Sequence, residues 1–576
     1  MLTKLMAALL AAVLFIACAA PAFADSPVNM TVSPGVAGSL EKIPEKSRQR
    51  VDTIVVGVPD LFGQTNPLFA NTLGDTYAAE LLFDEWVFLD EYGAPGEGMA
   101  RMSVSPDGLT YTFELKPARY SDLALVSADD CLNTLYLITM PGFDGSRDLR
   151  PLDVAGLAEY IDGTADTVSG FQKLSETSFS VTLNKPNASA PALLALPALR
   201  VAHFGSAVRP AGIGSNQIAS AAFYERRIKE IREADAWLAG YGQYDIVSIE
   251  PGQRAVFTAN EDYWRAKPST GTFELKVVPI GEEYEAMLSG DVDIISCFPD
   301  IAQIEKVYDS GDGFVSLYTW LGDSFGYLEM RAGNPLFDDA RVRRAFAYGL
   351  RRKSILQEMI SNYAELPGML LFDSFDYKSD VLGELYPYDS EASALLMDEA
   401  GWIAGEDGKR TKDGAEFSFT FIAAEENPMA DIVIREIQSL CDYLGLTVDA
   451  RKVSFSELTT QPEADMYLQA RRIPTSPAIA ANLFAGGSPL NDSGYDSEGV
   501  ERFMNWASLE TNPARQSIVY EGMFQQLYLE LPMIPLYRRF ELLLVNARIR
   551  NFYVSSGHDI TAEAYRMIIT TAYGDE

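Results

Sequence analysis

Apolar and polar side chains alternate most regularly between the Asp-Gly pair at 107–108 and Pro117. Successive side chains of an extended chain point to opposite faces, so this alternation predicts a β-strand with one buried and one solvated face. Shorter stretches of the same kind predict strands at 52–58, 178–184 and 254–260. The apolar positions of the first strand are Leu109, Tyr111, Phe113 and Leu115.

Other segments carry apolar residues at helical spacing, which predicts helices at 76–90, 338–360 and 431–445. Gly445 ends the last of these and suits the left-handed conformation of a helix C-cap. Ser127 predicts the start of another helix, because it is a good N-cap and acidic residues follow it.

These elements follow no regular order, since the chain shows neither a repeat nor a strict alternation of strands and helices. With 576 residues, of which 47% are hydrophobic, the chain is too long for one core and can bury several. We therefore predict a mixed α/β to α+β architecture of several lobes.

The N-terminus has the features of a secretory signal peptide. Lys4 precedes an apolar run over 5–17, and small residues at Ala22 and Ala24 fit a cleavage site after residue 24. Export to the periplasm follows, with no transmembrane helix in the mature protein. A lipoprotein signal with acylated Cys18 is the alternative. The polar, proline-bearing residues 25–50 predict a flexible leader.

A formal net charge of −35 argues against nucleic acid and anionic membrane surfaces as partners. The two histidines, His203 and His558, lie far apart in sequence, which argues against a histidine-rich metal site. After cleavage, Cys131, Cys297 and Cys441 remain. An odd number inside apolar patterns predicts small buried side chains and no disulfide framework.

One motif has a catalytic pattern, because "GDSFG" at 322–326 matches the nucleophile elbow G-x-S-x-G. That elbow requires a helix after the turn, whereas "YLEMRA" at 327–332 alternates like a strand. Hydrolysis by Ser324 is therefore disfavoured. The sequence also lacks a P-loop and a dinucleotide-binding glycine turn, so we expect no cofactor, no enzyme activity and a binding function.

The order of motifs resembles that of the family 5 extracellular solute-binding proteins, which are peptide, dipeptide and nickel receptors of ABC importers. Each motif is weak by itself, and their shared order makes the resemblance specific. The similar segments are "SPDGLTYTFELKPARYSD" (105–122), "SADDCLNTL" (127–135), "GYGQYDIVSIEPGQRAVFTANEDYWRAKP" (240–268), "AMLSGDVDI" (286–294), "NPLFDDARVRRAFAYGLRRKSIL" (334–356), "ASALLMDEAGW" (392–402) and "ELPMIPLYRR" (530–539).

This resemblance implies a type II periplasmic-binding-protein clamshell, in which two lobes and an extra subdomain close on a ligand and present it to ABC permease subunits. The chain would cross between the lobes near "LGDSFGYLE" and again near "LPMIPLY", which together form a hinge. The implied parts are lobe I (51–85, 201–325 and 532–576), the subdomain inserted in it (86–200) and lobe II (326–531). We expect a monomer.

Two adjacent arginines, Arg471 and Arg472, mark a departure from that family. Its peptide-binding members carry D-x-x-x-x-G-W-x-x-D, whose last aspartate receives the ligand's amino group. Laid on Asp465, the pattern places Ala470 at the glycine, Arg471 at the tryptophan and Pro474 at the aspartate. The acid is missing, so we expect an anionic ligand group here instead.

Two interpretations of the arginines remain open, because they could equally pair with surface acids. The resemblance also implies cleft positions at Asn71, Leu73, Ser324 and Phe325. Alternatives to an importer component are a receptor that reports an anionic solute to a membrane sensor, or a secreted hydrolase on the same fold. The sequence does not identify the ligand.

Overall fold

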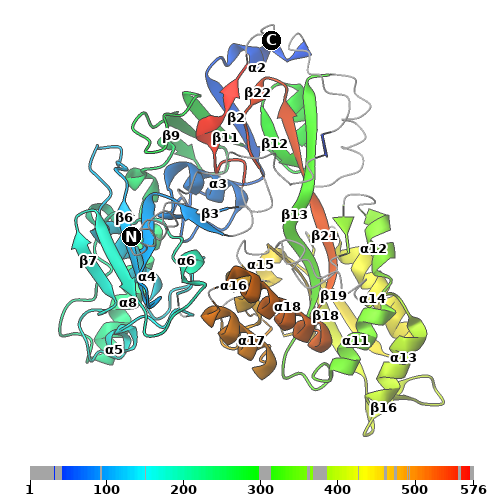
Figure 1. The fold of residues 1–576 in the computed structure, drawn as a ribbon. Coiled ribbons are helices and arrows are strands. Elements are labelled where there is room, and N and C mark those ends of the chain that lie inside the picture. Colours follow the sequence, from blue (N-terminus) through cyan, green and yellow to red (C-terminus); the bar gives the residue numbers. More distant parts are fainter. Residues whose placement is uncertain are drawn as a thin grey trace, which may run out of the picture.

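Three bodies make up the computed structural model (Figure 1): an upper lobe built on strands β2 and β9 to β12, a small lobe built on β5 to β8, and a lower lobe with helices α11 to α18. The structure describes residues 31–32, 42–90, 94–149, 151–297, 313–359, 364–366, 386–425, 427, 429–458, 463–472, 477–488, 491, 493–510, 512–554 and 559–570.

The upper lobe contains one end of the main sheet, in the order β12-β2-β11-β10-β9. The central pair β2 and β11 is parallel, and β10 pairs antiparallel with both of its neighbours. The predicted strands at 52–58 and 254–260 are confirmed as β2 and β10. The bounds are β2 (Thr53–Val58), β9 (Tyr244–Glu250), β10 (Arg254–Ala259), β11 (Thr272–Val277) and β12 (Ile294–Cys297).

Two long antiparallel strands, β13 (Val315–Met330) and β21 (Met533–Asn546), run side by side from the upper lobe into the lower lobe (Figure 1). Their pairing shifts register between Leu321 and Phe325 and again between Gly326 and Tyr327. In the lower lobe the sheet continues through β20 (Met466–Arg472), β18 (Ser418–Ala424) and β19 (Thr447–Val453).

The small lobe packs a four-stranded antiparallel sheet, β5-β6-β8-β7, against helix α4 (Ala128–Ile138). The predicted alternation is confirmed, because Tyr111 and Phe113 are buried on one face of β6, where Phe113 stacks on Phe179. Ser127 caps α4 in a capping box with Asp130. The strands are β5 (Ala100–Val104), β6 (Thr110–Leu115), β7 (Phe171–Ser175) and β8 (Ser178–Thr182).

Helices cover both faces of the lower-lobe sheet. Leu328 and Met330 of β13 pack with one group, and Phe325 and Tyr327 pack with the other. The first group comprises α11 (Ala340–Gly349), α12 (Arg352–Met359), α13 (Ser390–Glu399) and α14 (Ala430–Leu444), and the second α16 (Pro477–Ala481), α17 (Glu498–Leu509) and α18 (Pro513–Glu530). Gly445 ends α14 at φ 71°, which confirms the predicted C-cap.

Further strands and helices complete the described part of the fold. They are β1 (Thr31–Val32), β3 (Val87–Leu89), β4 (Pro95–Glu97), β14 (Ala364–Glu365), β15 (Ile403–Ala404), β16 (Arg410–Lys412), β17 (Ala415–Glu416), β22 (Ile549–Arg550), β23 (Ile568–Ile569), α2 (Glu45–Gln49), α3 (Leu73–Leu82), α5 (Leu157–Asp162), α6 (Ala190–Leu193), α7 (Val201–Phe204), α8 (Gln217–Glu233), α9 (Glu283–Leu288) and α15 (Phe455–Leu458).

The hydrophobic cores do not follow the division into three lobes. The upper and small lobes share one continuous core, which contains both Ile54 of β2 and Phe113 of β6. The lower lobe has separate cores on the two faces of its sheet. Because packed cores resist deformation, the upper and small lobes form one rigid unit and the lower lobe another.

Two predicted helices differ from the structure. The helix expected over 76–90 ends at Leu82, because Phe83 turns to extended backbone and Trp86 is buried against Phe113 and Phe179. The helix expected over 338–360 is divided into α11 and α12 at Leu350. In both places tertiary packing overrides the helical spacing.

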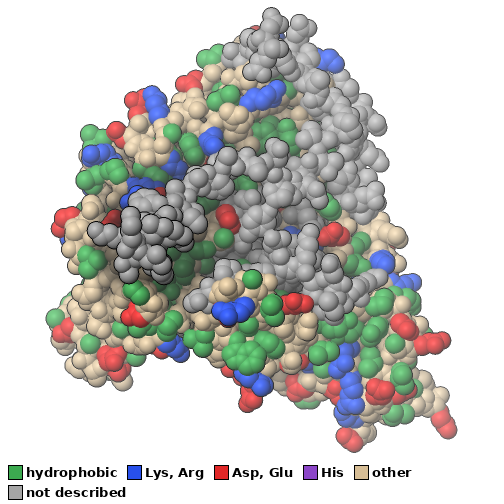
Figure 2. Space-filling view, viewed as in Figure 1, with side chains coloured by type: hydrophobic (Ala, Val, Ile, Leu, Met, Phe, Trp, Pro, Cys, Tyr) green, Lys and Arg blue, Asp and Glu red, His purple; other side chains and the backbone are tan. Residues whose placement is uncertain are grey.

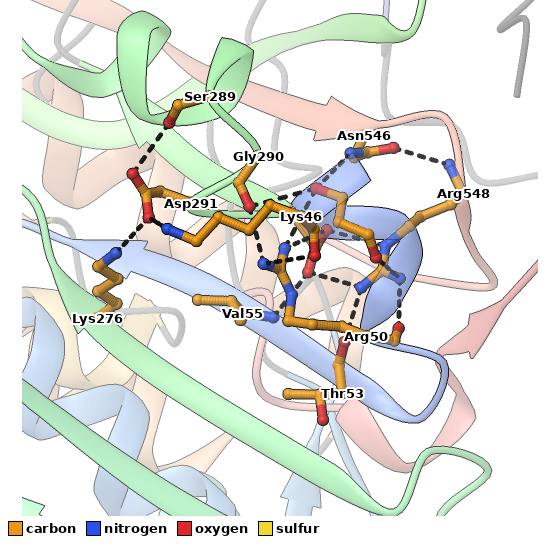
Figure 3. A network of polar contacts seen from close by, with 12 residues as sticks. Lys46, Arg50, Thr53, Val55, Lys276, Ser289, Gly290, Asp291, Asn546 and Arg548 are labelled. Carbon is orange, nitrogen blue, oxygen red and sulfur yellow. Dashed lines mark hydrogen bonds and ion pairs between the residues drawn. The ribbon is translucent and has the colours of Figure 1, made fainter. Parts of the chain in front are cut away.

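The end of the expected flexible leader is also folded, since residues 45–49 form α2. The reason is a polar network around Arg50 and Arg548 (Figure 3). Arg548 donates two hydrogen bonds to Asp293, both of 2.9 Å, and a third of 2.6 Å to the backbone carbonyl of Ser47. Arg50 joins the same carboxylate at 3.0 Å. This network, formed by Asp293, Arg548, Arg50 and Ser47, fixes α2 to the upper lobe.

Candidate functional site

The predicted site residues meet where β13 enters the lower lobe. Along the antiparallel pair of β13 and β20, Ser324 lies opposite Arg472, Phe325 opposite Arg471 and Gly326 opposite Ala470. The structure therefore brings together Ser324, Phe325, Ala470, Arg471 and Arg472 on two neighbouring strands.

Strand alternation decides which of the two arginines shares a face with Phe325. Residues directly opposite each other in a sheet project to the same side, so Arg471 accompanies Phe325 and Arg472 takes the alternate position. Phe325 is 2% exposed and stacks on Tyr327 in the hydrophobic cluster formed with α16 and α18. Arg471 is half-buried, and the side chain of Arg472 lies outside the described residues.

Strand β21 adds a third arginine, Arg538, which the sequence interpretation missed. Arg471, Arg472 and Arg538 together form what we call the arginine row. Arg538 lies opposite Phe325, is 3% exposed and donates a hydrogen bond of 2.6 Å to the carbonyl of Gly322. The next residue, Arg539, pairs with Glu541 at 3.4 Å. The available signal was the Arg-Arg pair at 538–539, inside the segment "ELPMIPLYRR" that resembles the family.

The backbone at this point is tightly packed. A side chain at Gly326 would collide with the ring of Tyr537. Burial raises the pKa of the Tyr537 phenol above its ordinary value, so this group stays neutral. Ser324 lies inside β13, which continues as a strand to Met330. The strand–turn–helix geometry of a nucleophile elbow is therefore absent around Ser324, as the sequence predicted.

Asn71 and Leu73 lie on the upper lobe and are not part of this row. Asn71 is exposed, whereas Leu73 begins α3 and packs half-buried against the upper core. The preceding loop is held by Asp75, which accepts hydrogen bonds from the backbone N–H groups of Phe62 and Gly63. Burial raises the pKa of Asp75. Pro474 and His558 lie outside the described residues.

Other chemistry is limited in the part of the chain that the structure describes. It contains no group of three or more His, Cys, Asp or Glu side chains arranged to hold a metal ion. Cys131 and Cys441 are buried free thiols, as predicted, and burial raises the pKa of both. The side chain of Cys297 is not described. No helix among these residues has the length and apolarity needed to cross a bilayer.

Several known proteins with similar sequences are named as binding proteins. The "Oligopeptide-binding protein AppA" of Bacillus subtilis is 25% identical over 312 residues, which cover 52% of this chain and 56% of that protein. This alignment therefore spans about half the length of each. A Brucella ovis protein, named as a candidate ABC transporter peptide-binding protein, is 22% identical over 86% of this chain and 89% of its own.

Solved structures share the fold. A lactococcal OppA "complexed with an endogenous peptide in the closed conformation" superposes with a TM-score of 0.74, at 17% identity, over 89% of this chain and 99% of that one. NikZ from Campylobacter jejuni "in complex with Ni(L-His)" gives a TM-score of 0.69, at 18% identity, over 90% and 99%. These likenesses confirm the type II clamshell fold.

The family description "Bacterial extracellular solute-binding proteins, family 5 Middle" matches residues 81–488, most of the chain. That segment includes the small lobe, the start of the strand crossing at 324–326 and the arginine-bearing strand β20. The agreement of family, relatives and fold is decisive: this chain belongs to the family 5 bacterial extracellular solute-binding proteins.

Proposed function

We propose that the protein is the substrate-binding component of an ABC importer, which captures a small solute between two lobes and delivers it to membrane permease subunits. Family membership supports this role. The proposed export signal is 1–24, with an anchor at Cys18 as the alternative. The proposed functional division is lobe I (51–85, 201–325, 532–576), its inserted subdomain (86–200) and lobe II (326–531).

The observation that carries the proposal is the pair of strands β13 and β21. They join the rigid unit formed by the upper and small lobes to the separately packed lower lobe. Their register shifts around Phe325 interrupt regular pairing where the strands pass from one unit to the other. Two chain crossings of this kind form a hinge, about which ligand binding can drive closure.

Closure can be tested on a ligand recovered with the protein from its own cells and identified by native mass spectrometry. Removing that ligand is expected to increase the radius of gyration in small-angle scattering, and adding it back should reverse the change. The melting temperature should rise with ligand concentration, because only the folded state binds. Tight binding without any change of shape would contradict the clamshell mechanism.

The ligand-binding face that we propose is the Arg471 side of β20. Arg471 shares its face of the sheet with Phe325. The protein as a whole is acidic, with a formal net charge of −35. Figure 2 shows acidic and basic side chains interspersed over the visible surface. A guanidinium group that is half-buried binds a carboxylate or phosphonate more strongly than one at an open surface. Asn71 and Leu73 are proposed to approach from the upper lobe.

A binding protein of this kind should not turn over its ligand. Ser324→Ala is expected to change ligand affinity by no more than a few fold, because Ser324 sits within a strand and lacks the geometry of a nucleophile. His558→Ala is likewise expected to change ligand affinity by no more than a few fold. Mass spectrometry of the ligand after prolonged incubation should show no product. Hydrolysis that disappears in Ser324→Ala would establish an enzyme instead.

A further inference from the structure

The hydrophobic cores locate the hinge to a few residues on each crossing strand. On β13, Trp320 belongs to the core that the upper and small lobes share, and Phe325 belongs to a core of the lower lobe. On β21, Leu542 belongs to a core of the upper lobe, and Tyr537 belongs to one of the lower lobe. The short stretch between the two residues of each strand is therefore where the angle between the rigid units is set.

Strand β13 carries a bulge within this stretch. Residues 322–324 of β13 lie opposite the single residue Arg539 of β21, so β13 has two extra residues between paired positions. A bulge bends its strand and re-aims the side chains beside it. The next residue is Phe325, which lies opposite Arg471 of β20. The shape of the bulge thus determines how the proposed ligand-binding face is presented.

A buried arginine holds the bulge from the side of the lower lobe. Arg538 is 3% exposed, and its Nε donates a hydrogen bond of 2.6 Å to the carbonyl oxygen of Gly322. On its other edge β21 pairs with β14, where Glu365 lies opposite Arg538 and Ala364 packs against a core of the lower lobe. The hydrogen bond therefore joins a residue that is fixed to the lower lobe to the first residue of the bulge.

A second contact confines the same residue of the bulge. A Cβ atom at Gly322 would lie 2.6 Å from Oε1 and 2.7 Å from Cγ of Glu541, which is closer than real Cβ atoms approach. Glu541 in turn pairs with Arg539 at 3.4 Å. The backbone of the bulge is therefore packed against the side chain of Glu541, and its carbonyl oxygen is bound by Arg538.

We propose that Arg538 is a positioning residue of the hinge. Through its hydrogen bond to Gly322 it holds the bulge of β13, and so sets both the angle between the two rigid units and the place of Phe325 beside Arg471. The inference rests on the proposed solute-binding function, in which the two units close on a solute. It differs from a role in contacting the solute, because it predicts changes in the ligand-free protein.

Hydrogen–deuterium exchange of the ligand-free protein tests this role. Arg538→Met keeps the length of the side chain and removes its donors. The backbone amides of 321–326 are expected to exchange at least roughly 10-fold faster in this variant, since a hydrogen bond from a charged donor is lost. Arg538→Lys should restore part of the protection, because lysine keeps a charged donor. Small-angle scattering should show a larger radius of gyration for Arg538→Met than for the wild type.

Gly322→Ala tests the same bulge while it leaves Arg538 in place. The added Cβ atom collides with Glu541, so the bulge is expected to shift and its amides to exchange faster, as in Arg538→Met. Exchange at the wild-type rate in Arg538→Met would overturn the proposal. Should that variant not fold, exchange at the wild-type rate in Gly322→Ala would overturn it.

Arg209→Met is the matched control. Arg209 is 1% exposed and also donates to backbone carbonyls, those of Tyr160 at 2.6 Å and Ala165 at 2.7 Å, but it lies beside α5 and α8 of the small lobe. This variant should lower the melting temperature and leave the exchange of 321–326 and the radius of gyration as in the wild type. Equal acceleration in Arg209→Met and Arg538→Met would show a general loosening of the fold and contradict the positioning role.

The test separates the role of Arg538 from the importer function, because exchange is measured without any solute. Wild-type exchange in Arg538→Met would disprove the hinge assignment alone, even in a protein that closes on its native ligand. Faster exchange in Arg538→Met, in a protein that never closes on its native ligand, would retain the assignment and contradict the importer mechanism.

Discussion

Replacement of Asp293 by alanine is expected to lower the free energy of unfolding by about 3–5 kcal/mol, because it leaves a buried arginine without its counter-ion. Asp293 and Arg548 have side chains that are 0% and 3% exposed. Asp293 also accepts a hydrogen bond of 3.0 Å from the backbone N–H of Val55. Removing this carboxylate therefore leaves several hydrogen-bond donors without their acceptor, including the guanidinium group of Arg50.

The matched control is Asp291→Ala, two residues earlier in the chain. Asp291 also accepts charge-assisted hydrogen bonds, from Lys46 and Lys276, but its side chain is 30% exposed. These lysines hold the pKa of Asp291 below its ordinary range. Solvent screens such pairs, so its loss should cost at most about 1 kcal/mol. Equilibrium unfolding in urea compares the variants, and equal midpoints for Asp293→Ala and Asp291→Ala would refute the role of the network.

Local patterns in the sequence predicted the elements that depend on local chemistry. The strand at Tyr111 and Phe113, the N-cap at Ser127 and the C-cap at Gly445 each follow from side-chain alternation or backbone preference within a few residues. The prediction of a helix over 76–90 was wrong beyond Leu82, because the structure there depends on contacts with distant residues. Trp86 is buried against Phe179, which is remote in sequence, and local spacing cannot report such packing.

The same limit applies to the leader and to the predicted helix over 338–360, which is divided into α11 and α12. Residues 45–49 are helical because Arg548, at the far end of the chain, donates to the carbonyl of Ser47. Helix α12 begins separately from α11 where Arg352 is buried and donates to the carbonyls of Pro535 and Tyr386. Each structure depends on a hydrogen bond between segments that only the completed fold brings together.

The candidate site was predicted as a set of residues, but its arrangement was not. The sequence indicated Arg471 and Ser324 separately, through the resemblance to a family. It could not show that Phe325 lies between Arg471 and Arg538, because strand register depends on the pairing of three distant segments.

The arginine row leads to the second prediction, which concerns ligand affinity. Arg471→Ala is expected to weaken binding of the native ligand roughly 10- to 150-fold, the equivalent of about 1.5–3 kcal/mol for a hydrogen bond to a charged group. Arg471→Lys should restore only part of this affinity, because lysine lacks the planar fork that binds a carboxylate with two hydrogen bonds. Both variants can be titrated calorimetrically with the ligand recovered from the native protein.

Arg472→Ala provides the matched comparison, since it removes the same charge from the alternate position of the same strand. If the arginines acted only through the general electrostatic potential, both alanine variants would weaken binding equally, and the loss would diminish in high salt. A specific contact from the face of Phe325 instead predicts a larger loss for Arg471→Ala that persists at high salt. Wild-type affinity in both alanine variants would show that neither arginine contacts the ligand.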